Sequence, residues 1–480
     1  MTKTIQISKE EQERSLRFME EGKQHVARLE EHLGRAPFAA VITFGCQMNA
    51  RDSEKLSGIL QSMGYRMTEE EDQADFVIFN TCTVRENADD RLYGRVGRLR
   101  GIKAKRPHMK IAVCGCMTQE LSAVERLRES YRHVDLIFGT FNLHRFAELV
   151  VTMFESDRQV VDIWKEAGEV TEDLPVLRKH FYKSGVNIMY GCDNFCSFCI
   201  VPYVRGRERS RASADILSEV RTLAKDGVRE VMLLGQNVNS YGHGVPGELS
   251  FPQLLREVCM IEGIERVRFM SSHPKDLSEE LIAVMRDQPK VARHLHLALQ
   301  SGSDRILKQM NRHYTKADFL HLIRRIREEI PDMAITTDII VGFPGEEDAD
   351  VQDTIDVIRE AAFDNAFTFI YSKRSGTKAA ALERIPEGMT KEEYHRRIQE
   401  RFDRVLKEVQ ESAKMRAARL AGECVQVLVE GVNAKDAALL TGRMSNNMLV
   451  HFPGDETLVG SMTDVMLDNC MGFYYTGHAI

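Results

Sequence analysis

Short apolar runs alternate with amphipathic stretches along most of this 480-residue chain, and this alternation restricts the fold more than any other feature. The first four apolar runs lie at residues 39–45, 75–80, 110–115 and 134–139. Helical patterns separate them, near 52–63, 86–100, 118–127 and 142–153. Continuous apolar strands separated by helices indicate a parallel sheet that is covered on both faces. We therefore expect residues 38–155 to form a doubly wound α/β domain.

A second series of the same kind follows a polar linker at 156–183. We expect its strands at 185–190, 229–234, 266–271, 294–299, 334–341 and 366–371. Six βα units in succession predict a parallel sheet that curls into a partial barrel. Together with a charged C-terminal helix, this domain should span residues 184–420.

The two ends of the chain have different patterns. Residues 1–37 are charged with scattered apolar positions, which predicts a helical extension. Residues 421–480 contain short strands punctuated by glycine, which predicts a small antiparallel β-barrel. The predicted fold class is therefore α/β with several domains.

The cysteines of this chain indicate metal binding or catalysis rather than disulfide bonds. No apolar run approaches the ~20 residues of a membrane helix, so we expect no membrane span. The N-terminal residues are charged and lack the apolar core of a signal peptide, so we expect a cytoplasmic protein. In that reducing compartment, clustered cysteines favour metal binding or catalysis over disulfide bonds.

The first cysteine cluster is GCDNFCSFC at 191–199, with Cys192, Cys196 and Cys199 in a C-x3-C-x2-C spacing. A structural zinc site normally has four ligands, and the next candidates along the chain are His243 and Cys259. Three cysteines on an iron–sulfur cubane leave one iron open to an external chelate. The amino and carboxylate groups of S-adenosylmethionine suit that position, and reductive cleavage of this cofactor yields an adenosyl radical. The alternatives are a zinc site or a chance group of thiols.

A second group of cysteines lies in the first predicted domain. Cys46, Cys82 and Cys116 each come just after the end of a predicted parallel strand. The carboxyl ends of such strands meet at one edge of the sheet, so these thiols could converge on a second cluster. The alternative is three buried structural thiols, since free cysteine is often a small core residue. We interpret the remaining four as structural: Cys114, Cys259, Cys424 and Cys470.

The segment GCDNFCSFCIVPYVRGRERSR at 191–211 resembles the radical S-adenosylmethionine motif of methylthiotransferases. It is most similar to the branch that acts on isopentenyladenosine in tRNA, the tRNA-2-methylthio-N6-dimethylallyladenosine synthases. The likeness runs from about Ala39 to the C-terminus. It implies two [4Fe-4S] clusters, a radical cluster on Cys192, Cys196 and Cys199 and a sulfur-donating auxiliary cluster on Cys46, Cys82 and Cys116. It also implies that residues 421–480 form a TRAM domain.

The same resemblance implies methylthiolation of carbon 2 of N6-isopentenyladenosine at position 37 of the tRNA anticodon loop. One S-adenosylmethionine would donate the methyl group and another would supply the radical. We identify no catalytic acid or base, because this chemistry requires none. The implied partners are tRNA and an electron donor such as flavodoxin or ferredoxin, and we expect a monomer.

Several polar and glycine residues follow the predicted barrel strands and are candidate contacts for the cofactor. Phe198 precedes the last cluster cysteine, at a position that resembles the aromatic residue beside the adenine in radical enzymes, although core packing is the alternative. The other candidates are Gly235, Gln236, Asn237, Gln300, Ser301 and Gly342. Ordinary βα turns are the alternative for these loops.

Candidate RNA contacts are local, because the net charge of −7 argues against a uniformly basic nucleic-acid binder. Four alternating arginines follow the cluster loop and suit phosphate neutralisation: Arg205, Arg207, Arg209 and Arg211. A solvated charged loop is the alternative. Residues 421–480 hold two basic residues against seven acidic ones, which weakens electrostatic RNA capture. Specific contacts from Arg443, Asn446, Asn447 or Phe452, or a lid function, stay open for that segment.

Rival functions share this architecture. They are methylthiotransferases that act on threonylcarbamoyladenosine in tRNA or on an aspartate of a ribosomal protein. Asp193, Asn194 and Phe195, together with the run RGRERSR, favour the isopentenyladenosine branch. A rival from another class is a non-catalytic RNA-binding metalloprotein.

Overall fold

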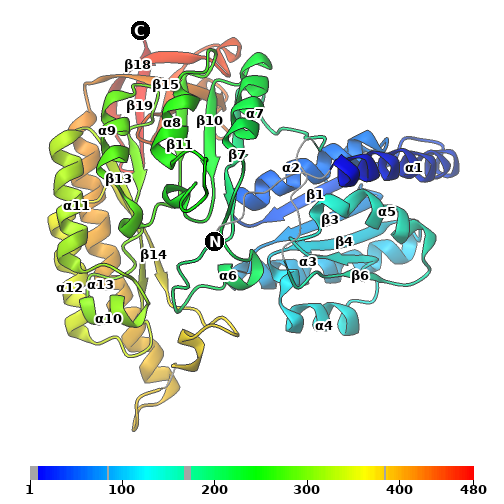
Figure 1. The fold of residues 1–480 in the computed structure, drawn as a ribbon, viewed down its shortest axis with the longest axis horizontal. Coiled ribbons are helices and arrows are strands. Elements are labelled where there is room, and N and C mark those ends of the chain that lie inside the picture. The colour runs from blue at the N-terminus through cyan, green and yellow to red at the C-terminus, as the bar shows by residue number, and fades with distance from the viewer. Residues whose placement is uncertain (1–8, 84–85, 167–173, 383–384) are drawn as a thin grey trace. The chain divides into compact units, whose positions relative to one another are not determined.

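The computed structural model describes residues 9–83, 86–166, 174–382 and 385–480 (Figure 1). The chain divides into two compact units, each of which is described by itself. The first comprises Met1–Lys179, Met189–Asp193 and Ile200–Ala212. The second comprises His180–Ile188, Asn194–Cys199 and Ser213–Ile480.

The first unit contains a six-stranded parallel sheet in the order β2-β1-β3-β4-β5-β6. Its strands are β1 (Phe38–Phe44), β2 (Arg66–Met67), β3 (Phe76–Thr81), β4 (Lys110–Gly115), β5 (Leu136–Phe138) and β6 (Val160–Asp162). Its main helices are α1 (Lys9–Leu33), α2 (Gln47–Ser62), α3 (Glu86–Lys105), α4 (Leu121–Ser130) and α5 (Phe146–Glu155). The four predicted apolar runs correspond to β1, β3, β4 and β5, while β6 lies within the stretch predicted as linker.

Both faces of this sheet are covered, as the continuous apolar strands predicted. On one face, Ile78 of β3 belongs to a buried cluster with Ile59 of α2 and Phe146 of α5. On the other face, Val77 of β3 packs in a cluster with Leu92 of α3, together with residues of α4. Neighbouring residues of one strand therefore contribute to opposite cores, which confirms the doubly wound domain.

The second unit contains the six parallel strands of the predicted partial barrel. They are β7 (Lys183–Asn187), β10 (Glu230–Leu234), β11 (Arg266–Phe269), β12 (His294–His296), β13 (Ala334–Val341) and β14 (Asn365–Ile370). They form two three-stranded sheets, β11-β10-β7 and β12-β13-β14. Isolated parallel bridges such as Ser272 to Leu297 connect the two halves. The predicted run 185–190 is interrupted at Ile188, since β8 (Met189–Tyr190) pairs antiparallel with β9 (Arg209–Ser210).

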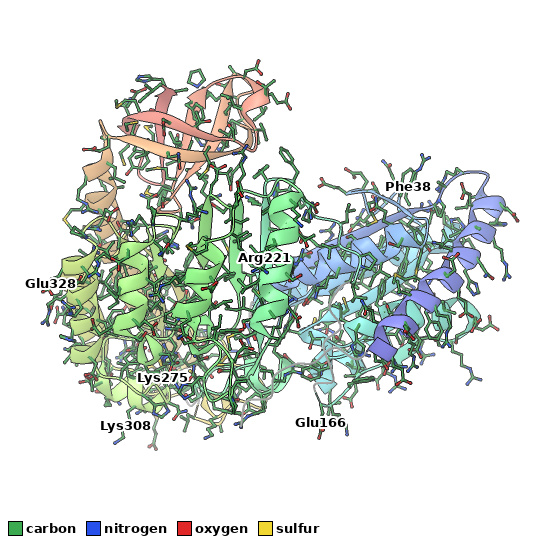
Figure 2. All side chains as sticks on the ribbon, turned by 45° about the horizontal axis from the view of Figure 1, so that its top comes forward. Phe38, Glu166, Arg221, Lys275, Lys308 and Glu328 are labelled. Atoms are coloured by element: carbon green, nitrogen blue, oxygen red, sulfur yellow. The ribbon has the colours of Figure 1, made fainter. Side chains whose placement is uncertain are left out.

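Helices follow these strands and present polar side chains to solvent. They are α7 (Ser213–Lys225), α8 (Phe251–Cys259), α9 (Glu279–Asp287), α10 (Asp304–Gln309), α11 (Lys316–Glu329), α12 (Asp348–Ala361) and α13 (Lys391–Ala417). On α11, Ile323 and Ile326 are buried whereas Glu328 is exposed and points outward (Figure 2). This pattern is typical of an amphipathic helix that covers a sheet. Among the described residues, no helix combines the length and the apolar character that crossing a membrane requires.

The C-terminal segment forms a closed five-stranded barrel in the order β15-β16-β17-β19-β18. Its strands are β15 (Cys424–Val432), β16 (Leu439–Met444), β17 (Leu449–Pro453), β18 (Met462–Cys470) and β19 (Tyr474–Ala479). All neighbours are antiparallel except β17 and β19, which pair in parallel. Phe452 is fully buried in the barrel core, so its side chain cannot contact RNA in this conformation.

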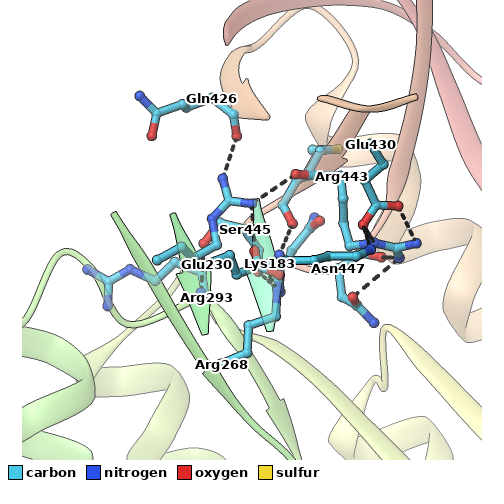
Figure 3. A network of polar contacts seen from close by, with 12 residues as sticks. Lys183, Glu230, Arg268, Arg293, Gln426, Glu430, Arg443, Ser445 and Asn447 are labelled. Carbon is cyan, nitrogen blue, oxygen red and sulfur yellow. Dashed lines mark hydrogen bonds and ion pairs between the residues drawn. The ribbon is translucent and has the colours of Figure 1, made fainter. Parts of the chain in front are cut away.

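A polar network joins this barrel to the amino ends of β7, β10 and β11 (Figure 3). Arg268 donates from Nη1 to Ser445 O at 2.8 Å, and its Nε lies 3.0 Å from Glu230 Oε2. Lys183 Nζ donates to Glu430 Oε1 at 2.6 Å. Arg443 is held by the same carboxylate and by the backbone oxygen of Asn447. The barrel therefore packs at the strand ends opposite to those that carry the predicted cofactor loops, which argues against a lid over them.

Candidate metal centres

The loop with Cys196 and Cys199 is fixed by backbone contacts within the second unit. Ser197 N donates to Met310 O at 3.0 Å, and Ser197 O accepts from Ala379 N at 2.8 Å. Asn311 Nδ2 donates to the carbonyl oxygens of Asn194 and Phe195, at 3.1 Å each. The segment after α10 therefore holds this loop in place.

Cys192 belongs to the first unit and follows a glycine that no other residue can easily replace. Gly191 has a φ of +76°, and a Cβ at this position would overlap the carbonyl oxygen of Arg207. Cys192 N donates to Gly206 O at 3.2 Å, and the Cys192 side chain is buried. The left-handed glycine thus lets the chain close tightly around this cysteine.

A buried arginine that the sequence did not single out contacts the radical-motif loop. Arg312 is only 7% exposed, and its Nη1 donates to Cys196 Sγ at 3.4 Å. Its Nε donates to Tyr314 Oη at 2.8 Å and its Nη2 to Ala298 O at 2.5 Å. Burial alone would lower the pKa of Arg312, but Tyr314 and the Cys196 thiol outweigh it and raise the pKa above its usual value. Arg312 therefore stays charged beside Cys196.

The second group of cysteines lies at the carboxyl ends of three neighbouring strands. Phe44 of β1 is in register with Thr81 of β3, and Thr81 is in register with Gly115 of β4. Cys82 N donates to Phe44 O at 2.7 Å, and Cys116 N donates to Thr81 O at 2.8 Å. Cys46 follows β1 after one glycine and occupies the N-cap position of α2. As the sequence predicted, each thiol follows a strand end at the same edge of the sheet.

Arg205 is buried at this edge rather than exposed to solvent. It is 6% exposed, its Nε donates to Cys116 Sγ at 3.2 Å, and its Nη2 lies 2.9 Å from Asp52 Oδ2. Burial opposes its charge, but Cys116 and Asp52 hold the pKa of Arg205 well above its ordinary value. Burial raises the pKa of Cys116, Arg205 lowers it, and the nearby Cys46 thiol raises it again, with the net result above the usual value.

The segment that carries Arg205 covers Cys116. Ile200 and Val204 form a buried apolar cluster with Cys116, and Thr140 Oγ1 donates to Val204 O at 2.8 Å. This segment includes the short helix α6 (Val201–Val204), which begins two residues after Cys199. The residues after the first cysteine motif thus shield the second group of cysteines from solvent.

The four arginines predicted to contact RNA differ in exposure. Arg205 and Arg211 are buried, at 6% and 3% exposure, and burial lowers the pKa of the half-buried Arg209. Only Arg207 is exposed, and its Nε lies 2.8 Å from Asp193 Oδ1. Burial removes Arg205 and Arg211 from the surface that a phosphate could reach. The four positions do not lie on one strand, since Arg205 ends the short helix that precedes it and only Arg209 lies within β9.

Two of the predicted cofactor residues, Phe198 and Asn237, have contacts within the second unit that fix their side chains. Phe198 packs against the cluster that contains Phe343 and Met310, so it has the core contacts named as the alternative. Asn237, which follows Gly235 and Gln236 after β10, donates to Asp276 Oδ2 at 2.7 Å.

Two further loops after β12 and β13 contain residues with left-handed backbone. Gln300 has a φ of +71° and is bound through its backbone to β13, beside the fully buried Ser301. Gly342 has a φ of +78°, and its N donates to Glu346 Oε2 at 2.6 Å. Desolvation raises the pKa of the Glu346 carboxyl to about 7, against the hydrogen bond from Gly342.

Each cysteine group offers three thiols, a donor set that suits an iron–sulfur cubane with one open iron. None of the ten cysteines, all of which lie in described segments, forms a disulfide bond. Over the described part of the chain, no three Cys, His, Asp or Glu side chains are grouped to hold one metal ion. A cubane needs no such grouping, because its cysteines bind different iron atoms. Each triad also presents one thiol to a buried arginine, which suits a thiolate ligand.

Comparisons with known proteins find two matching family models and a solved structure with a similar fold. The profile of the uncharacterized protein family UPF0004 matches residues 39–139, and that of the Radical SAM superfamily matches residues 186–358. The chain also shares its fold with a radical S-adenosylmethionine methyltransferase from Kitasatospora setae, with a TM-score of 0.53, 14% identity and coverage of 72% of this chain and 75% of that one.

Two relatives match over nearly the full length. The tRNA-2-methylthio-N(6)-dimethylallyladenosine synthase of Lachnoclostridium phytofermentans is 53% identical over 95% of this chain and 98% of its own. The protein of the same name from Acetivibrio thermocellus is 50% identical over 97% of this chain and 96% of its own. This chain therefore belongs to the tRNA-2-methylthio-N(6)-dimethylallyladenosine synthase family of radical S-adenosylmethionine enzymes.

Proposed function

We propose that this protein attaches a methylthio group to carbon 2 of N6-isopentenyladenosine in the anticodon loop of tRNA. The observation that carries the proposal is the presence of two separate cysteine triads, Cys192, Cys196 and Cys199, and Cys46, Cys82 and Cys116. A protein that only cleaves S-adenosylmethionine to a radical needs one cluster, whereas sulfur insertion needs a source of sulfur as well. The family to which the chain belongs supports the same reaction.

The bound groups would supply the reactivity that the side chains lack. A [4Fe-4S] cluster with S-adenosylmethionine provides a carbon radical that can break an unactivated C–H bond, and the auxiliary cluster provides sulfur. The first triad would hold the radical cluster and the second the auxiliary cluster. Phe198, Gly235, Gln236, Asn237, Gln300, Ser301 and Gly342 remain our proposed contacts for S-adenosylmethionine.

Substrate binding requires the target nucleotide to leave its stack, which costs least in a single-stranded loop. Arg207 is the exposed member of the arginine run and the proposed phosphate contact, with Arg209 beside it. The remaining partner is a one-electron donor such as flavodoxin or ferredoxin. We propose that the protein acts as a monomer in the cytoplasm, with domains at 38–155, 184–420 and 421–480 after the N-terminal helix.

Mass spectrometry of tRNA nucleosides tests this function. A strain that lacks the gene should accumulate N6-isopentenyladenosine without its methylthio group, and the wild-type gene should restore the modification. The Cys82→Ala and Cys199→Ala variants should fail to restore it, while Cys424→Ala, an exposed cysteine outside both triads, should succeed. Loss of the methylthio group from threonylcarbamoyladenosine instead would assign the protein to a different substrate.

A further inference from the structure

The two cysteine triads differ in the charge around the arginine that contacts each of them. Arg312 reaches Cys196 Sγ at 3.4 Å, and its other partners are the uncharged Tyr314 hydroxyl and Ala298 carbonyl. Arg205 reaches Cys116 Sγ at 3.2 Å, but its Nη2 also lies 2.9 Å from the Asp52 carboxylate. Both arginines are buried. One thiol therefore faces a full positive charge, and the other faces a nearly neutral pair.

The surroundings of Arg312 add no negative charge to offset it. Within the described segments, no carboxylate forms an ion pair with Arg312, and His273 packs edge-on against Tyr314 with ring centroids 5.7 Å apart. Burial, with help from Arg312, lowers the pKa of His273 to about 2, so this imidazole is neutral. At the other triad, the side chains of Asp52 and Arg205 are 8% and 7% exposed. Water therefore screens neither arrangement well.

The difference in charge beside the two thiols affects how readily each cluster accepts an electron. Reduction adds one electron to a cubane, so a nearby positive charge and an N–H···S hydrogen bond stabilise the reduced form. A carboxylate close to the same guanidinium cancels much of that stabilisation. A cluster beside Arg312 should therefore accept an electron more readily than a cluster beside the Asp52–Arg205 pair.

We propose that Arg312 and the Asp52–Arg205 pair set two different reduction potentials, so that one electron from the donor reduces the radical cluster and leaves the auxiliary cluster oxidised. The inference rests on the proposed function, which assigns a [4Fe-4S] cluster to each triad. The step is the one-electron reduction of one cubane by an external one-electron donor, and no bond is formed or broken in it. Arg312 and Arg205 contact thiol ligands and Asp52 acts through Arg205, so all three are positioning residues.

The test is a redox titration of the reconstituted full-length chain, followed by electron paramagnetic resonance. The variant Cys46→Ala, Cys82→Ala, Cys116→Ala retains the radical cluster, and the variant Cys192→Ala, Cys196→Ala, Cys199→Ala retains the auxiliary cluster. The radical cluster should have the higher potential. A tenfold difference in the ratio of reduced to oxidised cluster at a given potential corresponds to about 59 mV for one electron.

Substitutions then show which residues cause the difference in reduction potential between the two clusters. Arg312→Gln should lower the potential of the radical cluster, and Asp52→Asn should raise that of the auxiliary cluster, each by about a tenfold change in that ratio. Glu230→Gln is the matched control, since this buried carboxylate pairs with Arg266 and Arg268 and contacts no thiol. It should shift neither potential. If a glutamine variant does not bind iron, Arg312→Lys and Arg205→Lys can be measured in its place. Both keep the positive charge and should keep the order of the two reduction potentials.

Each result either supports or overturns the proposed difference between the two reduction potentials. Equal or reversed potentials in the two single-cluster proteins would overturn this inference alone. The inference would also be overturned if Asp52→Asn left the potential of the auxiliary cluster unchanged. It would likewise be overturned if Glu230→Gln shifted that potential as much as Asp52→Asn does. Failure of either triad to bind a cluster would overturn the assignment of clusters together with this inference.

Discussion

Gly191 determines whether the backbone can close around Cys192. Its φ of +76° costs a residue with a Cβ about 1–2 kcal/mol, and an added Cβ would also overlap the Arg207 carbonyl. We expect Gly191→Ala to displace the cysteine and to halve the iron that the reconstituted protein retains. The measurement is iron content per chain.

A second glycine provides the control for this substitution. Gly227 has a φ of +88° but no atom lies within 4 Å of the position that its Cβ would occupy. Gly227→Ala therefore introduces the backbone strain without the overlap and should retain all of the iron. Equal iron in the two variants would show that the close approach at Gly191 does not matter for the cluster.

At the scale of elements, helix α1 is a structural part of the first unit rather than a peripheral extension. Met19 and Val26 are 4% and 2% exposed and belong to the core on one face of the sheet, whereas Leu16 is 56% exposed. Met19→Ala should lower the free energy of unfolding by about 2–5 kcal/mol through the cavity that it leaves. Leu16→Ala on the same helix should change it by less than about 0.5 kcal/mol. Denaturant titrations of the two variants measure this difference, and similar values for both would place α1 outside the core.

The junction between the strands and the C-terminal barrel should weaken in acid. Burial alone would raise the pKa of Glu430, but Arg443 and Lys183 lower it from 4.5 to about 2. A carboxyl whose folded pKa is depressed stabilises the fold above its unfolded pKa, and this contribution is lost as the pH falls from 4.5 to about 2. The shift corresponds to about 3 kcal/mol at neutral pH.

Glu430→Gln tests this dependence. The difference in free energy of unfolding between the cluster-free wild type and this variant should be largest near pH 7 and should shrink as the pH falls below 4.5. Glu423→Gln, at an exposed position in the same barrel, should have little effect at any pH. A difference for Glu430→Gln that does not vary with pH would mean that the ion pairs with Arg443 and Lys183 contribute no stability.

At the scale of the whole molecule, the sequence predicted those features that depend on the order of apolar and polar residues along the chain. The positions of Cys46, Cys82 and Cys116 after three strands followed from apolar runs, because carboxyl ends of parallel strands share one edge. The pairing of Arg205 with Asp52 could not be predicted, because the two lie 153 positions apart and their contact depends on tertiary packing. Arg205 therefore resembled its exposed neighbour Arg207 in sequence, although it is buried.

The contact between Arg312 and Cys196 could not be predicted from the sequence either. Arg312 lies in the segment between α10 and α11, and nothing in the spacing around it indicated a contact with Cys196, which precedes it by more than a hundred residues. The start of α2 did offer a signal, since Asp52 lies on the helix that Cys46 begins and is buried at the same edge. A buried carboxylate requires a cationic partner, and Arg205 provides it, although only the tertiary packing shows which cation does so.

The central claim is that two cysteine triads hold two separate iron–sulfur clusters, and anaerobic analysis of iron and acid-labile sulfide tests it most directly. The reconstituted wild-type chain should contain about eight iron and eight sulfide ions, as two [4Fe-4S] clusters require. Replacing Cys46, Cys82 and Cys116 with alanine, or Cys192, Cys196 and Cys199, should leave about half of each. One cluster in the wild type, or zinc in place of iron at either triad, would contradict the account.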